Sequence, residues 1–516
     1  MSKFSQLTVL TAILCAHGIP APSRAQDKEA KPSEKPSDSP APKEESSVTE
    51  HSLKLGSQTI PYKATAATIL LKSDKDEPTA LIYFTAYTRS DVKDSATRPI
   101  AFLYNGGPGS ASVWLHMGSF GPKRVATTNA EPTPPPPYKF GDNAYSLLDK
   151  TDLVFIDPVG TGFSHAVGKA QDKDFWGIDQ DLKSIAQLIN IYVSRNNRWN
   201  SPKFLIGESY GTFRSAALSS YMQSHDGMYF NGIVLISCVL DLGTISFNPG
   251  QDMTYIFYLP SYAATAWYHK VLKDRPENLN TLLEETRKYA QSEYATALMK
   301  GTRLSAPEKA EVAKRLSQYT GLSEDYLVKA NLRVNLPQFM KELQRSRGLT
   351  TGRLDARFSG ASVDLLGEYA DYDPQDTSIT GPYAAAFNTY VREELKFGQE
   401  KTYHTGSDEA GNLWDWKHNS GGNNFGFPGS PNVEGDLVQA LVTNPHLKVE
   451  VENGYYDLAT PFFATEYTME HLGLPEKLQN NIKLQYYDAG HMMYLRDEDL
   501  AKLKANIATF IDSAAK

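Results

Sequence analysis

Short apolar runs bounded by polar or turn residues recur along the first half of the chain. Five of them are predicted to be strands, at residues 80–85, 100–104, 153–156, 203–206 and 233–236. Each run is apolar at nearly every position, which is typical of strands covered on both faces in a parallel sheet. Between two of these runs, apolar residues recur at helical spacing, at Leu182, Ile185, Ile189 and Tyr192. Strands joined by a helix in this way indicate an α/β protein with a mostly parallel central sheet and helices on both faces.

The pattern changes between residues 248 and 360, where helical periodicity replaces the short apolar runs. Residues 279–288 are one predicted helix, and Ser305-Ala-Pro-Glu308 has the form of a capping box with proline in the first turn. No strand is evident in this stretch. We therefore interpret residues 248–360 as a helical insertion that forms a cap.

The sheet pattern resumes after the insertion. Two further strands are predicted at 447–451 and 482–486, followed by a closing helix with apolar residues at Leu500, Leu503, Ile507 and Phe510. The chain is thus divided into a core formed by residues 51–247 and 361–516, with the cap inserted between its two parts.

The first 50 residues have patterns of their own. An apolar stretch at about 7–19 follows Lys3 and ends in small residues, which predicts a signal peptide over 1–25; a buried N-terminal helix is the alternative. Cys15 follows Leu14, whereas a lipoprotein signal favours a small residue there, so lipidation is disfavoured. Residues 26–50 are rich in Lys, Glu, Pro and Ser and are predicted to be a disordered linker, with order beginning near Leu53. We expect export to the periplasm or the extracellular space.

Composition excludes several classes of function. The chain of 516 residues is 41% hydrophobic, and its net charge of −8 comes without clusters of Lys and Arg, so no nucleic-acid partner is expected. No later stretch is apolar enough for a membrane span, and no metal-binding or phosphate-binding motif is present, so we expect no metal and no nucleotide cofactor. Cys238 lies in a predicted buried strand and is assigned no chemistry.

The central chemical motif is Gly207-Glu-Ser209-Tyr-Gly211. It lies between the predicted strand 203–206 and a helical run at 212–222, which is the strand–turn–helix context of the nucleophile in an α/β-hydrolase fold. The glycines are required because the turn holds Ser209 in a strained conformation, where larger side chains would collide with neighbouring elements. The bare pattern occurs by chance in long chains, so the context carries the prediction.

A serine hydroxyl becomes a good nucleophile only when a base removes its proton, and a carboxylate must orient that base. In this fold the acid and the histidine follow the serine, on loops after later strands. His491 comes after the strand at 482–486, and Asp457 comes after the strand at 447–451. They are the predicted base and acid. Asp488 is a rival acid, but it lies three residues before His491 on the same loop and is a less natural partner.

A glycine-rich loop, Asn105-Gly-Gly-Pro-Gly109, follows the predicted strand at 100–104. Consecutive glycines leave backbone N–H groups unobstructed, as the stabilisation of a developing oxyanion requires. An ordinary tight turn is the alternative interpretation. The position of the loop ahead of the Gly207–Gly211 motif favours the oxyanion role.

Taken together, these motifs resemble the serine carboxypeptidase family. The matching segments, in the order of the family, are Asn105-Gly-Gly-Pro-Gly109, Phe120-Gly-Pro122, Asp157-Pro-Val-Gly-Thr-Gly-Phe-Ser164, Gly207-Glu-Ser-Tyr-Gly211 and Ala489-Gly-His491. The resemblance extends from about residue 55 to the end, and the helical insertion diverges most. It implies a catalytic triad of Ser209, Asp457 and His491, and a peptide substrate that loses its C-terminal amino acid through an acyl-enzyme.

The resemblance also implies roles for the residues around the nucleophile. The backbone N–H groups of Gly107 and Tyr210 would form the oxyanion hole, and Asn105, Gly106 and Glu208 would bind the C-terminal carboxylate of the peptide. A carboxyl group binds a carboxylate only if one of the two holds a proton, so activity on peptides is expected to favour mildly acidic pH.

The sequence departs from the family at one position that bears on this role. Ser119 stands where family members usually have an acidic residue that supports carboxylate binding, and the disulfides common in relatives are absent. An esterase or acyltransferase, another exopeptidase such as an aminopeptidase-like relative, and a catalytically inactive binding protein therefore remain as alternatives. Trp414 and Trp416 either line a substrate pocket or pack in the core. The side-chain preference and the oligomeric state are left open.

Overall fold

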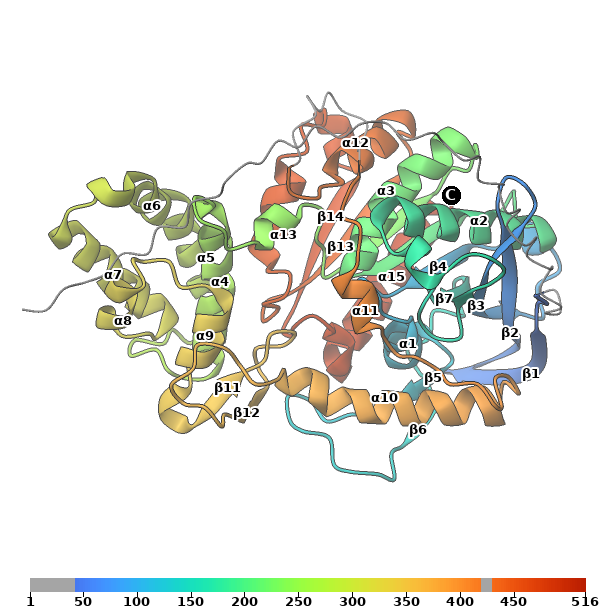
Figure 1. Ribbon diagram of the computed structural model, residues 1–516, viewed down its shortest axis with the longest axis horizontal. Helices are drawn as coiled ribbons and strands as arrows, with labels where there is room; N and C mark the ends of the chain where they lie inside the picture. Colours follow the sequence, from blue (N-terminus) through green and yellow to red (C-terminus); the bar gives the residue numbers. More distant parts are fainter. Residues whose placement is uncertain (1–41, 419–428) are drawn as a thin grey trace, which may run out of the picture. The chain divides into compact units, whose positions relative to one another are not determined.

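A ten-stranded mixed sheet organises the part of the chain that the computed structural model describes, residues 42–418 and 429–516 (Figure 1). The strand order is β1-β2-β3-β7-β4-β9-β10-β13-β14, and β8 pairs with β3 beside this path. The predicted signal peptide at 1–25, Cys15 and linker residues 26–41 lie outside the described residues. The strands are β1 (Ser46–Leu55), β2 (Gln58–Lys72), β3 (Pro78–Arg89), β4 (Ile100–Tyr104), β7 (Asp152–Ile156), β8 (His165–Ala166), β9 (Lys203–Glu208), β10 (Gly232–Ile236), β13 (Lys448–Gly454) and β14 (Ile482–Tyr487).

The sheet changes character at β7. Strands β1, β2, β3 and β7 pair antiparallel, whereas β7, β4, β9, β10, β13 and β14 pair parallel. The seven strands expected from the sequence are all present, with bounds that differ from the predicted ones by at most four residues. The mostly parallel α/β architecture is therefore confirmed.

The predicted disorder of residues 26–50 is wrong for its last residues, because β1 begins at Ser46. The strand pairs with β2 along its full length, from Ser46 opposite Ala67 to Leu55 opposite Gln58. Among its side chains only Leu53 is buried, so the strand is held by its backbone hydrogen bonds and by its neighbour rather than by an apolar face of its own. Because the segment is rich in polar residues and has no apolar pattern, the sequence did not indicate strand β1.

Helices cover both faces of the sheet and complete two separate parts of the core. On one face lie α2 (Ile178–Arg195), α3 (Tyr210–His225) and α12 (Glu434–Thr443); on the other lie α1 (Val113–Leu115), α10 (Pro374–Glu393) and α15 (Asp497–Ala514). Neighbouring residues of a strand point to opposite faces, so Phe102 packs in the first part and Leu103 in the second. Among the described residues, no helix is long and apolar enough to cross a membrane.

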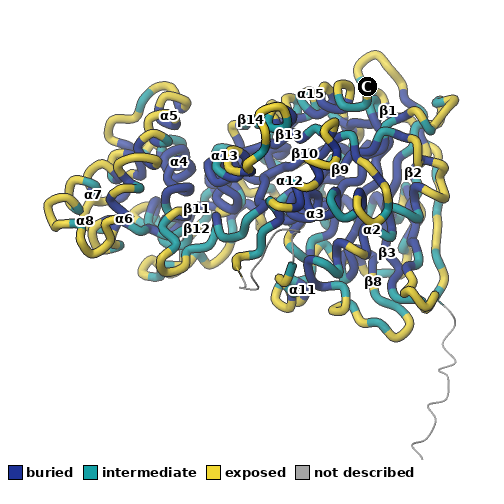
Figure 2. Tube along the Cα trace, turned by 90° about the horizontal axis from the view of Figure 1, so that it is seen from above, coloured by how far each residue is buried: buried dark blue, intermediate teal, exposed yellow. Residues whose placement is uncertain are grey.

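The predicted insertion is a cluster of helices, visible at the left of Figure 1, whose hydrophobic core also includes Tyr456, Leu458 and residues 462–464. Its outer surface is exposed, while the helix sides that face one another are buried (Figure 2). The cluster consists of α4 (Asp252–Tyr268), α5 (Leu279–Tyr289), α6 (Ala295–Lys300), α7 (Ala306–Thr320), α8 (Glu324–Lys329) and α9 (Leu336–Glu342). The capping box at Ser305 and Glu308 is formed as expected.

The expectation of no strand between 248 and 360 is wrong. A hairpin of β11 (Leu349–Thr351) and β12 (Ser359–Ala361) follows the helices, with Thr350 opposite Gly360. Strands of three residues are too short to show an alternating pattern, which is why the sequence did not indicate them. Smaller elements complete the described chain: β5 (Lys123–Val125), β6 (Phe140–Asp142), α11 (Asp408–Asn412), α13 (Phe462–Glu470) and α14 (Glu476–Gln479).

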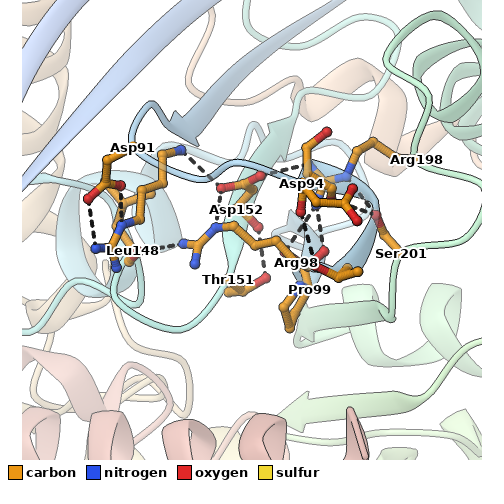
Figure 3. A network of polar contacts seen from close by, with 12 residues as sticks. Asp91, Asp94, Arg98, Pro99, Leu148, Thr151, Asp152, Arg198 and Ser201 are labelled. Carbon is orange, nitrogen blue, oxygen red and sulfur yellow. Dashed lines mark hydrogen bonds and ion pairs between the residues drawn. The ribbon is translucent and has the colours of Figure 1, made fainter.

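A buried ionic network joins the starts of β4, β7 and β9 (Figure 3). The carboxylate of Asp152 accepts hydrogen bonds from Arg98 Nε at 2.7 Å and from Arg198 Nη1 at 2.6 Å. Other nitrogens of the same two guanidinium groups also donate hydrogen bonds. Arg98 Nη2 donates to the Leu148 carbonyl, Arg198 Nε donates to the Ser201 hydroxyl, and Arg198 Nη2 donates to the Arg98 carbonyl. Because Asp152 and Arg198 are almost fully buried, each charge depends on the other for the interaction that water would otherwise supply.

Asp152→Asn should destabilise the fold. The substitution leaves two buried guanidinium groups without a counter-charge, and breaking a buried pair in this way costs about 3–5 kcal/mol. Urea unfolding followed by tryptophan fluorescence would measure the loss. Asp91→Asn is the control, because Asp91 pairs with Arg89 at the surface and its removal should leave the unfolding midpoint unchanged. Equal midpoints for Asp152→Asn and the wild type would contradict a structural role for the network.

Candidate active site

The carboxyl ends of the parallel strands meet at a cavity of about 480 Å³. Parallel α/β sheets bind their ligands at this edge, because the loops that leave the strands converge there. The loops after β4, β9 and β14 bring together the predicted site residues Asn105, Gly106, Gly107, Glu208, Ser209, Tyr210 and His491 in the lining of the cavity. Asp457, after β13, lies fully buried behind His491.

Ser209 occupies a strained turn between β9 and α3. Its backbone has φ 60° and ψ −128°, a conformation that residues with a side chain rarely adopt. The flanking glycines allow the turn: a Cβ at Gly207 would lie 2.7 Å from Ser215 Oγ, and a Cβ at Gly211 would lie 2.8 Å from the Tyr104 carbonyl. The packing thus supports the reason given for these glycines from the sequence.

Asp457 is fixed as a partner of His491. Its Oδ2 lies 2.8 Å from His491 Nδ1, and its Oδ1 accepts hydrogen bonds from the backbone N–H groups of Ala459 and Thr460. The Thr460 hydroxyl donates to Oδ2 at 2.8 Å. These bonds hold the carboxylate so that it accepts the Nδ1 proton of His491, which leaves Nε2 as the basic nitrogen. The rival acid, Asp488, has a side chain that is 63% exposed.

Two distant segments hold the loop of His491 in place. The backbone N–H of His491 donates to the Leu354 carbonyl at 2.7 Å, and the N–H of Gly490 donates to Asp355 Oδ2 at 3.1 Å. From the other side, the Ser237 hydroxyl donates to the His491 carbonyl at 2.6 Å. No pattern in the sequence indicates these supporting residues, because their contacts arise only when the chain folds.

The charge state of His491 depends on its two carboxyl neighbours. Burial by itself would lower the pKa of the imidazole, but the carboxylates of Asp457 and Glu208 outweigh it and hold the pKa above its ordinary value. His491 and Glu208 are therefore coupled. A proton on Glu208 removes one of the two charges that favour the imidazolium.

The glycine-rich loop after β4 lies beside the nucleophile. Gly107 has φ +100°, and a Cβ at Gly106 would lie 2.8 Å from the Glu208 carbonyl, so both positions require glycine. A segment far along the chain holds the loop: Ala111 N–H donates to the Thr405 carbonyl at 3.0 Å. Tyr210 is the first residue of α3, so its N–H belongs to the helix terminus, which has no intrahelical acceptor.

Glu208 carries a buried carboxyl group next to Ser209. Asn105 Nδ2 donates to Glu208 Oε1 at 2.8 Å, and Asn105 Oδ1 accepts from Leu115 N–H at 3.0 Å, which sets the orientation of the amide. Burial raises the pKa of Glu208 to about 7, although His491 and the hydrogen bond from Asn105 act in the opposite direction. The group therefore exchanges its proton near neutral pH.

Ser119 does not take the place of an acidic residue beside Glu208. Its hydroxyl donates to the Leu115 carbonyl at 2.7 Å, and its own carbonyl accepts from Asn143 Nδ2. The side chain is fully buried and engaged in its own turn. The hydroxyl at position 119 therefore forms no hydrogen bond with Glu208 in the described part of the chain.

Other residues in the lining of the cavity are of two kinds. Trp416 lines it and lies edge-on to Tyr210 at 6.0 Å, while Trp414 is buried and packs on Tyr210 at 5.3 Å, so the two tryptophans divide the roles left open by the sequence. The lining also includes the apolar side chains of Val239, Leu242 and Ile245. Polar side chains in the lining include those of Asp376, Thr380 and Asp408.

Comparisons with known proteins identify relatives that match parts of the sequence. The pheromone-processing carboxypeptidase KEX1 of Saccharomyces cerevisiae is 32% identical over 116 residues, which are 22% of this chain and 15% of that protein. Serine carboxypeptidase-like 22 of Arabidopsis thaliana is 24% identical over 197 residues, 36% of this chain and 39% of that protein. The matched segments thus span less than half the length of these relatives.

A solved structure is similar over much more of the chain. The crystal structure of KEX1(delta)p, a prohormone-processing carboxypeptidase from Saccharomyces cerevisiae, has a TM-score of 0.55 at 18% identity, with 88% of this chain and 91% of that chain covered. At this identity the likeness concerns the fold alone, and it confirms the α/β-hydrolase fold. The sequence profile of the serine carboxypeptidase family matches residues 61–502, nearly the whole of the described chain. The chain belongs to the serine carboxypeptidase family.

Proposed function

We propose that the protein is a serine carboxypeptidase that releases the C-terminal amino acid of a peptide through an acyl-enzyme on Ser209. The observation that carries the proposal is the buried carboxyl group of Glu208, held by Asn105 at 2.8 Å in the same cavity as Ser209. A protonatable carboxyl group beside a nucleophile is suited to bind a substrate carboxylate at a fixed distance from the scissile bond. An enzyme that cleaves internal bonds or esters needs no such group.

In the proposed reaction, Ser209 Oγ attacks the carbonyl carbon of the last peptide bond while His491 Nε2 takes the hydroxyl proton. Asp457 stabilises the imidazolium through the bond at Nδ1. His491 then gives the proton to the leaving nitrogen, and the C-terminal amino acid departs. A water molecule, activated by the same imidazole, hydrolyses the acyl-enzyme and regenerates the serine.

The oxyanion of each tetrahedral intermediate would bind to the backbone N–H groups of Gly107 and Tyr210. Both residues line the cavity next to Ser209. The positive end of α3 adds a favourable field at this point, because the helix begins at Tyr210. Such donors contribute to the rate because they are in place before the charge develops.

Carboxylate recognition by Glu208 gives the reaction a pH dependence. Glu208 is protonated below its pKa of about 7, and only then can it share a proton with the substrate carboxylate. KM should therefore be low at mildly acidic pH and rise as the pH passes 7. His491 must be neutral to act as a base. When Glu208 is protonated, its negative charge no longer raises the pKa of His491, so the imidazole stays neutral to lower pH.

We also propose that the protein acts outside the cytoplasm. The proposal rests on the signal-peptide pattern of residues 1–25, which lie outside the described part of the chain. The thiol of Cys238 is buried, and burial raises its pKa to about 12, so it stays protonated and unreactive in such an environment.

N-blocked dipeptides should lose their C-terminal amino acid, and the corresponding C-terminal amides should react far more slowly. The reason is that the amides lack the carboxylate that Glu208 and Asn105 would bind. Release of the amino acid would be measured from about pH 4 to 8, the range over which Glu and His titrate. The activity on free acids should be highest at mildly acidic pH.

Ser209→Ala is the control for this assay, and its activity should be absent at every pH. Equal cleavage of acids and amides, or activity on esters alone, would leave the nucleophile in place and contradict carboxylate recognition. Binding of peptides without any turnover would favour the inactive binding protein instead.

Glu208→Gln should abolish the rise of KM above neutral pH. The amide of Gln can donate to a carboxylate as protonated Glu does, but it does not titrate. For the wild type, KM at pH 8 should exceed KM at pH 6 by about tenfold, because pH 8 lies one unit above a pKa of about 7. Steady-state kinetics with one N-blocked dipeptide at both pH values would show the ratio fall to near one in the variant.

Peptide amides serve as the matched control, since neither enzyme should show this ratio for a substrate without a carboxylate. A tenfold rise of KM that persists in Glu208→Gln would mean that another group controls binding. In that case the assignment of Glu208 would be wrong even if the enzyme releases C-terminal amino acids.

A further inference from the structure

Two buried polar atoms next to the site have no hydrogen-bond partner among residues 42–418 and 429–516. They are Oε2 of Glu208 and the hydroxyl of Tyr494. Buried polar atoms are nearly always satisfied, so two neighbouring exceptions at one site call for an explanation. The two groups are neighbours: Glu208 and Met492 line the same cavity, Tyr494 follows Met492 by two residues, and each of the two groups affects the pKa of the other.

The ring of Tyr494 lies in the hydrophobic core and is not part of the cavity lining. It is fully buried and belongs to the short turn Met493–Leu495, which directly follows the loop of His491. Arg124 Nη2 donates to the Tyr494 carbonyl at 3.1 Å. Gly118 makes room for the ring, because a Cβ at this position would lie 2.7 Å from Tyr494 Cε2. Glu208 thus lines the cavity, whereas the phenol of Tyr494 is fixed in the core.

The chemistry of the two groups is complementary. Burial raises the pKa of Tyr494 well above its ordinary value, so the phenol stays protonated and can only be a donor toward a carboxylate. Ser119 cannot supply this donor, since its hydroxyl is bonded to Leu115. The titratable groups that interact electrostatically or by hydrogen bonding with the carboxyl group of Glu208 are His491, Asp457, Tyr383 and Tyr494 itself.

We propose that Tyr494 is a positioning residue for substrate recognition: its hydroxyl supports Oε2 of Glu208 from the core side and sets the pH above which peptide binding is lost. This inference rests on the proposed carboxypeptidase activity. Tyr494 does not touch the substrate; it acts through Glu208. Because its phenol stays protonated, Tyr494 is a donor that does not compete with Glu208 for the proton.

The consequence is a defined change in the pH profile. The phenol favours the charged form of Glu208, because a donor stabilises a carboxylate more than a neutral carboxyl group. Without it, Glu208 should keep its proton to higher pH. The rise of KM for a peptide acid should then move upward by about one pH unit, the size expected for one hydrogen bond to a charged group.

Tyr494→Phe tests the inference, because it removes the hydroxyl and leaves the buried ring. We expect its KM profile for an N-blocked dipeptide, measured from pH 5 to 9, to be displaced toward high pH with kcat within about twofold of the wild type. Tyr289→Phe is the matched control: Tyr289 is also buried with an unpartnered hydroxyl among the described residues, but it lies in the cap. Its profile should coincide with that of the wild type.

A second measurement does not depend on turnover. The carboxyl stretch of Glu208 can be identified in the infrared spectrum as the difference between the wild type and Glu208→Gln, and it should titrate at higher pH in Tyr494→Phe. In Glu208→Gln, the further change Tyr494→Phe should have no effect on the pH profile, since the group on which Tyr494 acts is gone.

The possible results distinguish the role of Tyr494 from the proposed carboxypeptidase activity. If the wild type releases amino acids but Tyr494→Phe has an unchanged KM profile and an unchanged carboxyl titration, Tyr494 has no role in recognition and the proposed function stands. If the wild type releases no amino acid from any blocked dipeptide, both proposals are overturned.

Discussion

The parallel register of β4, β9, β10, β13 and β14 is the constraint on which the rest of the structure depends. Parallel strands that start together also end together, so the loops that leave them emerge at one edge of the sheet. The glycine-rich loop, the nucleophile turn, Asp457 and His491 each follow a different strand of this set. Without that register, residues separated by hundreds of positions would not meet at one cavity.

Buried charged groups differ between the two ends of the parallel strands. At the starts of β4, β7 and β9, the carboxylate of Asp152 accepts hydrogen bonds from Arg98 and Arg198, which neutralise its charge. At their ends, Glu208 is buried with one oxygen held by Asn105 and the other free of any partner among the described residues. A buried carboxyl group with an unsatisfied oxygen destabilises a fold, whereas the fully bonded carboxylate of Asp152 does not carry this cost. The difference separates a structural network from a site.

The catalytic loops are supported by segments that lie far away in the sequence. Backbone contacts at Leu354 and Asp355 hold the loop of His491, and the segment around Thr405 holds the glycine-rich loop. The first of these segments follows the cap helices, so the insertion is connected directly to the base of the proposed triad. Changes within the insertion can therefore affect the position of His491 without contact with the substrate.

Local patterns in the chain were enough to predict the strands at 100–104, 203–206 and 482–486, the strained turn at Ser209 and the order of the proposed triad. Apolar runs, glycine spacing and the position of loops are all local signals. These patterns missed β1 and the β11–β12 hairpin, since one strand depends on a neighbour for its hydrogen bonds and the other two are only three residues long.

The surroundings of these local elements depend on contacts between segments that lie far apart in the chain. In the folded protein Asp457, and not Asp488, is the partner of His491. Trp416 lines the cavity, whereas Trp414 is buried against Tyr210. Tyr494 lies near Glu208. No spacing in the chain encodes these relations. They follow from burial and from contacts between distant segments, which exist only after the sheet and its helices have packed together.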